Sequence, residues 1–183
     1  MNKLSILAVA VVLISAPTQA EPLRTIRGRC GFVMNIPSPW SIVKAKPWQV
    51  ADSCSVEVVR KKRRTAKPER VLTLELFSAT HEEICDKVMI CQDENGEWQI
   101  AGRAGATNQA DVKETPAWRE IVGLSETGSY DEERGYQGMA QVYVALLDNR
   151  KGRMAIFVGS SDFAEEKLFN AIVSSFRFAE PAN

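Results

Sequence analysis

The chain has 183 residues, 45% of them hydrophobic, and its 23 Lys and Arg residues are balanced by 23 Asp and Glu residues. This length is typical of one domain with a substantial core. Because the net charge is zero, no overall field draws the protein to nucleic acid or to an anionic membrane.

Residues 1–20 have the organisation of a secretory signal peptide. One positive charge precedes the apolar run Ile6–Ile14, and small residues fit a signal-peptidase site that ends at Ala20. The apolar run is shorter than the ~18 residues that a membrane anchor needs. We therefore expect cleavage between Ala20 and Glu21, release into the periplasm or the medium without a stable membrane anchor, and a single domain formed by residues 21–183.

The first part of the mature chain predicts strands. Residues Gly31–Val43 contain two short apolar runs around a Pro-Ser-Pro turn, which indicates two strands joined by a bend. We expect Trp40, which begins the second run, to fill a core. The alternating pattern that follows predicts a hairpin with a charged connection. Its two strand faces are Cys54, Val56 and Val58, and Leu72, Leu74 and Leu76.

The middle of the chain predicts one short helix, one strand and a loop. A capping-box pattern with an apolar pair four residues apart predicts a helix over residues 81–89. After a turn at Asp93–Gly96, Trp98 and Ile100 predict another strand. The segment Gly102–Pro116 is polar and rich in glycine and alanine, so we expect it to be an exposed loop.

Three more strands are expected in the last third of the chain. Apolar runs predict strands at Trp118–Leu124, Met139–Leu147 and Met154–Val158, with Ser125–Gly138 as a polar connection. The turn at Asp148–Gly152 is short, so the last two of these strands should be antiparallel.

The clearest helical pattern comes last. Asp162 is expected to cap the helix, with Glu165 three residues further on. The apolar stripe that follows has helical spacing, so this helix should lie on a sheet. The stripe consists of Phe163, Leu168, Phe169, Ile172, Val173 and Phe176.

Four cysteines follow the cleavage site, and an oxidising export compartment favours disulfides over a metal site. Of the three possible pairings we favour Cys30 with Cys54 and Cys85 with Cys91, because each closes a local loop, although spacing alone leaves all three open. A fully helical span would separate the last two Cα atoms by ~9 Å, beyond the ~7 Å that a disulfide tolerates, so the helix should end before Cys91. Zinc is not expected, since the ligand spacing is wrong and His81 is the only histidine.

The motifs of hydrolytic chemistry are incomplete. Segment Gly123–Gly128 has the residues of a nucleophile elbow, but its second glycine follows Ser125 by three positions instead of two, which favours a strand-ending turn. Nothing in the sequence brings His81 to this serine, and oxidised cysteines cannot act as nucleophiles. Adjacent acids such as Glu82 and Glu83 are expected to be solvated. We therefore predict no catalytic residue, cofactor or metal, with a small envelope hydrolase as the third alternative.

Two charged segments are candidate binding surfaces. A basic run inside the predicted hairpin could hold an acidic partner, an anionic ligand or a lipid headgroup, or could be a solvated hairpin tip. An acidic loop flanked by tyrosines has a composition suited to a protein contact. The candidates are Lys61, Lys62, Arg63 and Arg64 in the basic run, and Tyr130, Asp131, Glu132, Glu133 and Tyr136 in the acidic loop.

The two ends of the mature chain carry a family resemblance. The opening Phe32–Pro37 followed by Trp40, and the closing strand, glycine, amphipathic helix and Ser175–Phe178, resemble the PsbP/Mog1-like proteins. In that superfamily such motifs bracket a twisted, mainly antiparallel sheet with helices on its faces. The resemblance implies a single α+β domain with helices packed on the sheet, and a role in binding without shared catalytic residues.

Together these observations predict a non-catalytic exported binding or accessory protein. Its expected partner is another protein, or else an anionic ligand or lipid headgroup. The alternative from a different class is an immunity or inhibitor protein that neutralises a toxin or an envelope hydrolase through a charged loop.

Overall fold

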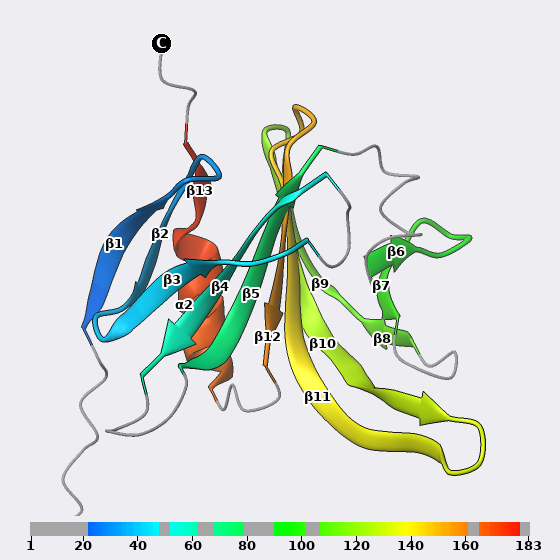
Figure 1. The fold of residues 1–183 in the computed structure, drawn as a ribbon. Helices are drawn as coiled ribbons and strands as arrows, with labels where there is room; N and C mark the ends of the chain where they lie inside the picture. The colour runs from blue at the N-terminus through cyan, green and yellow to red at the C-terminus, as the bar shows by residue number, and fades with distance from the viewer. Residues whose placement is uncertain are drawn as a thin grey trace, which may run out of the picture.

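The computed structural model describes residues 22–47, 52–61, 68–78, 90–101, 107–160 and 165–179. In these ranges the chain is mostly β, with three antiparallel sheets and one helix of 10 residues (Figure 1). The predicted α+β fold with helices packed on a sheet is therefore wrong. The error arose because polar segments that resembled loops are strands, whose backbone groups are satisfied by pairing with neighbouring strands.

The largest sheet has seven strands in the order β3-β4-β5-β12-β11-β10-β9. Its central strands are buried on both faces; every residue of β5 from Val71 to Phe77 is buried, including the polar Thr73 and Glu75. The strands are β3 (Trp40–Lys44), β4 (Cys54–Arg60), β5 (Glu69–Phe77), β9 (Asp111–Thr115), β10 (Trp118–Asp131), β11 (Gly135–Asp148) and β12 (Met154–Gly159).

Two smaller sheets and the helix α2 (Glu166–Ser175) complete the described fold. In Figure 1, α2 and the β1-β2-β13 sheet lie on one side of the large sheet, and the β6-β7-β8 sheet lies on the other. Their strands are β1 (Leu23–Gly28), β2 (Phe32–Pro37), β13 (Arg177–Phe178), β6 (Ile90–Gln92), β7 (Trp98–Ala101) and β8 (Thr107–Gln109).

Each face of the large sheet has its own hydrophobic core. On the α2 side, four fully buried phenylalanines from β2, β12, α2 and the residue after α2 pack together: Phe32, Phe157, Phe169 and Phe176. Trp40 is 6% exposed and belongs to this core, so its predicted role is confirmed. On the opposite face, Ile90 and Ile100 of the third sheet pack against apolar residues of β10, β11 and β12.

Helix α2 confirms the predicted apolar stripe over most of its length. Phe169, Ile172 and Val173 are buried. The helix ends at Ser175, and the backbone N–H of the following residue, Phe176, donates to Val173 O. The helix begins later than the capping pattern suggested, because its N-cap is Glu165 and makes no side-chain capping hydrogen bond. The expected cap, Asp162, lies outside the described residues.

The strands from residue 31 to residue 77 match the sequence pattern. The two runs in Gly31–Val43 are β2 and β3, although the two strands belong to different sheets. Strands β4 and β5 form the expected antiparallel pair, with Val56 opposite Leu74 and Val58 opposite Leu72.

Two segments expected to be loops are corrected by the structure. Within Gly102–Pro116, residues 107–109 form β8 and residues 111–115 form β9, while residues 102–106 lie outside the described part. The expected connection Ser125–Gly138 consists of the outer halves of β10 and β11, which pair antiparallel as far as Asp131 opposite Gly135. Gly135 closes this turn with a φ of 69°, in the region that favours glycine.

The paired ends of β10 and β11 extend beyond their neighbours. Strand β9 pairs with β10 only at Trp118–Val122, and β12 pairs with β11 only at Val144–Asp148. Beyond these points the two strands form an arm that projects from the sheet in Figure 1. We call residues 123–143 the hairpin arm.

The Cys30–Cys54 disulfide is confirmed, with its Cα atoms 5.7 Å apart. It connects the turn between β1 and β2 to the start of β4. Cys91 is also disulfide-bonded, whereas Cys85 and the helix predicted over residues 81–89 lie outside the described residues, as does the predicted signal peptide. No helix in the described part of the chain is both long and apolar enough to cross a membrane.

Candidate functional site

A pocket of about 520 Å³ lies beside the Cys30–Cys54 disulfide, between β1 and the strands β3 and β4, of which β3 is an edge of the large sheet. We call it the basic pocket, because three cationic residues line it. The remaining lining is mainly apolar and includes the disulfide itself. The cations are Arg27, Arg29 and Lys44, and the apolar residues are Ile42, Val43 and Val56.

The local backbone explains how the two arginines reach this pocket. They flank Gly28, the last residue of β1, which pairs directly with Phe32 of β2. A side chain at Gly28 would overlap the Phe32 ring, so only glycine lets this buried ring lie against β1. Arg29 then enters the tight turn that Gly31 completes with a φ of 74°.

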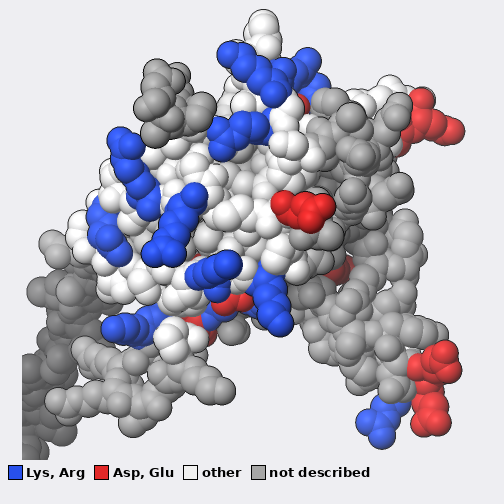
Figure 2. All heavy atoms as spheres, turned by 45° about the horizontal axis from the view of Figure 1, so that its top comes forward, with Lys and Arg blue, Asp and Glu red and all other residues white. Residues whose placement is uncertain are grey.

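The region around the pocket is strongly positive. Residues 22–47 contain no Asp or Glu, and Figure 2 shows Lys and Arg gathered on this side of the molecule. Of the five cations in this range, Arg24 is occupied, since it donates to Ser38 O at 3.1 Å and to Trp40 O at 2.8 Å. The others are Arg27, Arg29, Lys44 and Lys46, all exposed.

No hydrogen bond or ion pair joins the side chain of Arg27, Arg29 or Lys44 to another described residue. No described carboxylate therefore forms an ion pair with these three cations. An arginine offers planar, paired donors that match the geometry of a carboxylate or a phosphate. The basic pocket can thus take an anionic group, and its apolar wall can take the hydrocarbon attached to that group.

The basic run predicted from the sequence is only partly placed. Arg60, at its start, is bound by Glu69, with the guanidinium 2.8 Å from the carboxylate. Lys61 is exposed. Lys62, Arg63 and Arg64 lie outside the described residues, so their role as a binding surface stays a prediction.

The acidic loop predicted from the sequence is the tip of the hairpin arm. Tyr130 pairs across the strands with Tyr136, and Asp131 pairs with Gly135. Glu132 and Glu133 are exposed in the turn. The side chains of the two tyrosines and of Asp131 are outside the described part, so only their backbone positions are established.

A second pocket was not anticipated from the sequence. It is a groove of about 600 Å³ beside α2, where the helix leaves the β9–β11 end of the large sheet uncovered. We call it the α2 groove. Residues from β8, β9, β10, β11 and α2 line it, among them Asn108, Asp111, Lys113, Val122, Leu124, Gln141, Tyr143, Glu166 and Asn170.

Strand register shows which side chains share the face of this groove. Asp111 is directly opposite Val122, and Leu124 is directly opposite Tyr143, so these four residues lie on one face of the sheet. Tyr143 identifies that face as the one under α2, because its ring stacks on Phe169 with the centroids 5.5 Å apart. No local motif could have indicated the groove, since its residues come from five separate elements.

One side chain in the α2 groove has an unsatisfied polar atom. The amide oxygen of Asn170 is shielded from solvent and has no hydrogen-bond partner among the described residues. Leaving such an acceptor unpaired costs about 1–3 kcal/mol.

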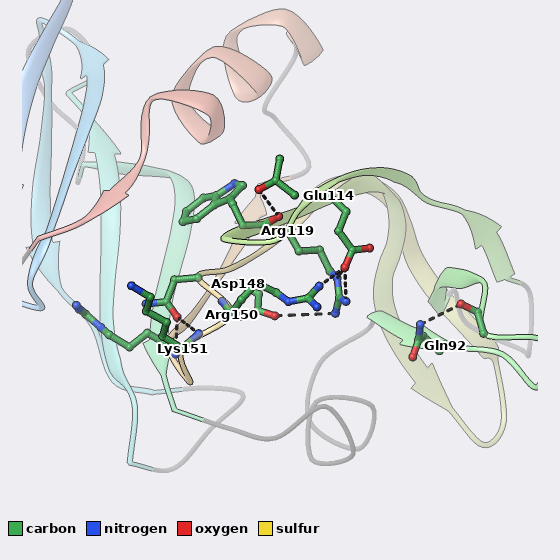
Figure 3. A network of polar contacts seen from close by, with 11 residues as sticks. Gln92, Glu114, Arg119, Asp148, Arg150 and Lys151 are labelled. Carbon is green, nitrogen blue, oxygen red and sulfur yellow. Dashed lines mark hydrogen bonds and ion pairs between the residues drawn. The ribbon is translucent and has the colours of Figure 1, made fainter.

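A network of charged side chains at the end of the sheet is satisfied internally (Figure 3). Arg119 is buried and lies 2.7 Å from Glu114 and 3.9 Å from Asp148. Arg150 also pairs with Glu114, and its backbone N–H donates to Asp148 at 2.6 Å. The hydrogen bond from Arg119 lowers the pKa of Glu114, assisted by Arg150 and opposed by partial desolvation. The network fastens β9 and the β11–β12 turn to β10.

Within the described part of the chain, the candidates for hydrolytic chemistry form no site. Ser125 was expected in a strand-ending turn, but it is fully buried within β10, so that expectation is wrong. Its side chain lies on the opposite face from Leu124. His81 lies outside the described residues. Among the residues described, no group of three or more His, Cys, Asp or Glu side chains could hold a metal ion.

Comparison with known proteins adds no relative: no protein-family model matches the chain, and no curated protein matches it.

Proposed function

We propose that this protein is a non-catalytic exported binding protein, and that the basic pocket binds an amphiphilic anion. The ligand class is a carboxylate or phosphate attached to a hydrocarbon body. The observation that supports this most is the lining of the pocket, where three cations without described partners lie beside an apolar wall. The predicted resemblance to the PsbP/Mog1-like proteins stays a prediction.

The dimensions suit a small amphiphile. Ligand pockets commonly have volumes of about 300–1,000 Å³, are mainly apolar, and use a few polar groups to orient the ligand. The basic pocket has about 520 Å³, and Val43 in its wall is 40% exposed. Burying each methylene group of a ligand against this wall would contribute up to about 0.8 kcal/mol. The cations would select the headgroup, and the wall would favour an attached chain.

The test is binding of dodecanoate and dodecyl phosphate to the mature protein, measured by calorimetry below their micellar concentrations. We expect both to bind, and inorganic phosphate and acetate to bind at least 10-fold more weakly because they lack the chain. Dodecanol should also bind at least 10-fold more weakly, because it lacks the charge. Added salt should weaken binding, since exposed charges are screened.

A triple variant, Arg27→Ser, Arg29→Ser and Lys44→Ser, should lose at least 10-fold in affinity for both amphiphiles. The matched control removes three exposed cations elsewhere, at Arg70, Lys151 and Lys167, and should bind within about 2-fold of the wild type. Vesicles with anionic lipids distinguish a free amphiphile from a bilayer headgroup. Equal losses in the two triple variants, or no binding of any anionic amphiphile, would overturn the proposal.

A second candidate is an inhibitor or immunity protein, which the projecting hairpin arm favours. Its acidic tip extends beyond the neighbouring strands, as a segment that enters a cleft of another protein would. Replacing Glu132 and Glu133 with serine should then weaken capture of one specific partner from an envelope extract. If the same proteins are captured in the same amounts, the arm has no such role.

A further inference from the structure

We propose that the Cys30–Cys54 disulfide is a thiol-exchange site, at which a small thiol that carries a carboxylate forms a mixed disulfide with Cys54. The inference uses cations of the basic pocket but does not depend on the binding of an amphiphile there. It follows from three features. The disulfide is accessible from the pocket, cations line the pocket beside it, and other contacts hold both of its ends.

The disulfide is exposed on the side of Cys54. Both cysteines line the basic pocket, which has a volume of about 520 Å³. Cys54 is exposed at the start of β4, whereas Cys30 is only partly exposed and packs against the core on the α2 side. An incoming thiol therefore reaches the sulfur of Cys54 more readily, which makes Cys54 the site of attack and Cys30 the leaving group.

Strand register places one cation on the same side of the sheet as Cys54. Lys44 of β3 is directly opposite Val56 of β4. Val56 follows Cys54 by two residues, so the three side chains lie on one face. Diagonal neighbours such as Lys44 and Cys54 are about 7–8 Å apart, which is within reach of a long side chain. The ammonium group of Lys44 can therefore approach a thiol that attacks Cys54.

A second cation lies beside the sulfur that leaves. Arg29 directly precedes Cys30 in the turn between β1 and β2, which a backbone hydrogen bond of 3.1 Å closes. Its side chain, like that of Lys44, forms no ion pair with a described residue. Cations attract an anionic thiol and favour the thiolate form of the leaving sulfur. The nearest acid in the sequence, Asp52, precedes β4 and does not line the pocket.

Other contacts hold both ends of the disulfide. On the Cys30 side, the backbone oxygen of Gly31 accepts hydrogen bonds from the Arg153 guanidinium at 3.0 Å and from Ala179 N at 2.8 Å. On the other side, β4 pairs with β5 from its first residue, Cys54. Both cysteines therefore keep their places when the bond between them opens, and the reaction does not require unfolding.

The reaction exchanges one disulfide for another. The small thiol loses its proton to solvent, and its thiolate attacks the sulfur of Cys54. A new S–S bond forms there, and the bond to Cys30 breaks with its electron pair leaving on the Cys30 sulfur as a thiolate. No external oxidant is needed. The Cys30 thiolate reverses the step when it attacks Cys54 and expels the small thiol.

The disulfide at Cys91 provides an internal reference with the opposite surrounding charge. Cys91 is disulfide-bonded and belongs to β6. Residues 90–101 contain three carboxylates and no Lys or Arg. The intrinsic reactivity of a thiol affects both disulfides alike, so the ratio of the opening rate at Cys54 to the opening rate at Cys91 isolates the effect of local charge.

The test treats the folded mature protein with three small thiols: 3-mercaptopropionate, which is negative, 2-mercaptoethanol, which is neutral, and cysteamine, which is positive. Alkylation of the released cysteines and peptide mass spectrometry follow both disulfides over time. We expect the rate ratio of Cys54 to Cys91 to be at least about 10-fold higher with 3-mercaptopropionate than with cysteamine, and intermediate with 2-mercaptoethanol. The small thiol should be attached to Cys54, and the released thiol should be on Cys30.

Substitutions identify the charges responsible. In the double variant Arg29→Ser and Lys44→Ser, the preference for the negative thiol should fall to about 2-fold or less, because the local attraction is removed. The matched control Arg70→Ser and Lys167→Ser removes two exposed cations elsewhere and should keep the preference of the wild type. Tryptophan fluorescence shows whether each variant stays folded during the reaction.

Three results would overturn this inference. The first is a rate ratio that is the same for all three thiols, which a purely structural disulfide would give. The second is attachment of the small thiol mainly to Cys30. The third is opening of the Cys30–Cys54 bond only in protein that has been unfolded with urea. The rates are measured without amphiphile, so a failure to bind dodecanoate would overturn the proposed function and leave this inference unaffected.

Discussion

Replacing Phe176 with alanine tests how the helix is held on the sheet. The side chain is fully buried immediately after α2. Its ring centroid lies 5.8 Å from that of Phe32, 5.3 Å from that of Phe157 and 5.0 Å from that of Phe178. These contacts connect the end of the helix to β2, β12 and β13, so one truncation opens a cavity where three elements meet.

The expected loss follows from this burial. Phe→Ala substitutions in cores cost about 3–5 kcal/mol, and the three ring contacts place Phe176 in the middle of that range, at about 4 kcal/mol. In urea, with a slope of about 2 kcal/mol/M, the unfolding midpoint should fall by about 2 M. For a domain of this size the melting temperature should fall by about 10 °C.

Urea unfolding followed by tryptophan fluorescence measures this loss. The control is Phe178→Ala, because Phe178 is only half-buried in the last strand, and we expect it to cost about half as much. A loss below about 1 kcal/mol at Phe176, or a larger loss at Phe178, would show that the helix does not depend on this packing and would refute the reasoning.

Three further predictions concern stability. Replacing both Cys30 and Cys54 with alanine should cost about 3 kcal/mol in urea unfolding, because the unfolded chain gains the entropy of the opened loop; an unchanged midpoint would contradict this. Gly28→Ala should cost about 1–3 kcal/mol by overpacking against the β2 phenylalanine ring, and a neutral effect in the same assay would show that the ring can move. The hydrogen bond from Arg119 lowers the pKa of Glu114 from its ordinary value of 4.5. The ionised carboxylate therefore stabilises the fold fully above pH 4.5, and this stabilisation is lost as the pH falls through the lowered pKa of the folded state. The melting temperature of Glu114→Gln should therefore lie below that of the wild type at neutral pH and approach it in acid. A difference in melting temperature that stays constant with pH would refute this.

Much of the fold was predictable where burial repeats with a regular period. The alternation of Leu72, Leu74 and Leu76 identified β5, and the spacing of Phe169, Ile172 and Val173 identified α2. In both cases the burial of one face requires apolar residues at regular intervals in a short stretch of sequence.

The polar strands were not predictable in this way. Strand β9 is exposed at every residue, and the outer half of β10 was expected to be a connection. Strand formation in such segments is decided by the partner strand, which supplies hydrogen bonds to the backbone whatever the side chains are. The wrong expectation of an α+β fold came from the resemblance to the PsbP/Mog1-like proteins, and these two segments add strands that it did not include.

By itself the sequence determined the apolar faces of β4, β5 and α2 and the core position of Trp40, because each depends on residues that are near one another in the chain. Spacing favoured the Cys30–Cys54 pair but left all three pairings open, and the structure decided it. Only the tertiary structure decided the two pockets. Arg29 and Lys44 meet because a disulfide and a strand pairing bring their elements together. Asp111 and Glu166 border one groove because β9 and α2 approach the same face of the sheet. Binding sites of this kind depend on contacts between elements that are far apart in the sequence. No spacing of residue types within a single segment predicts such contacts.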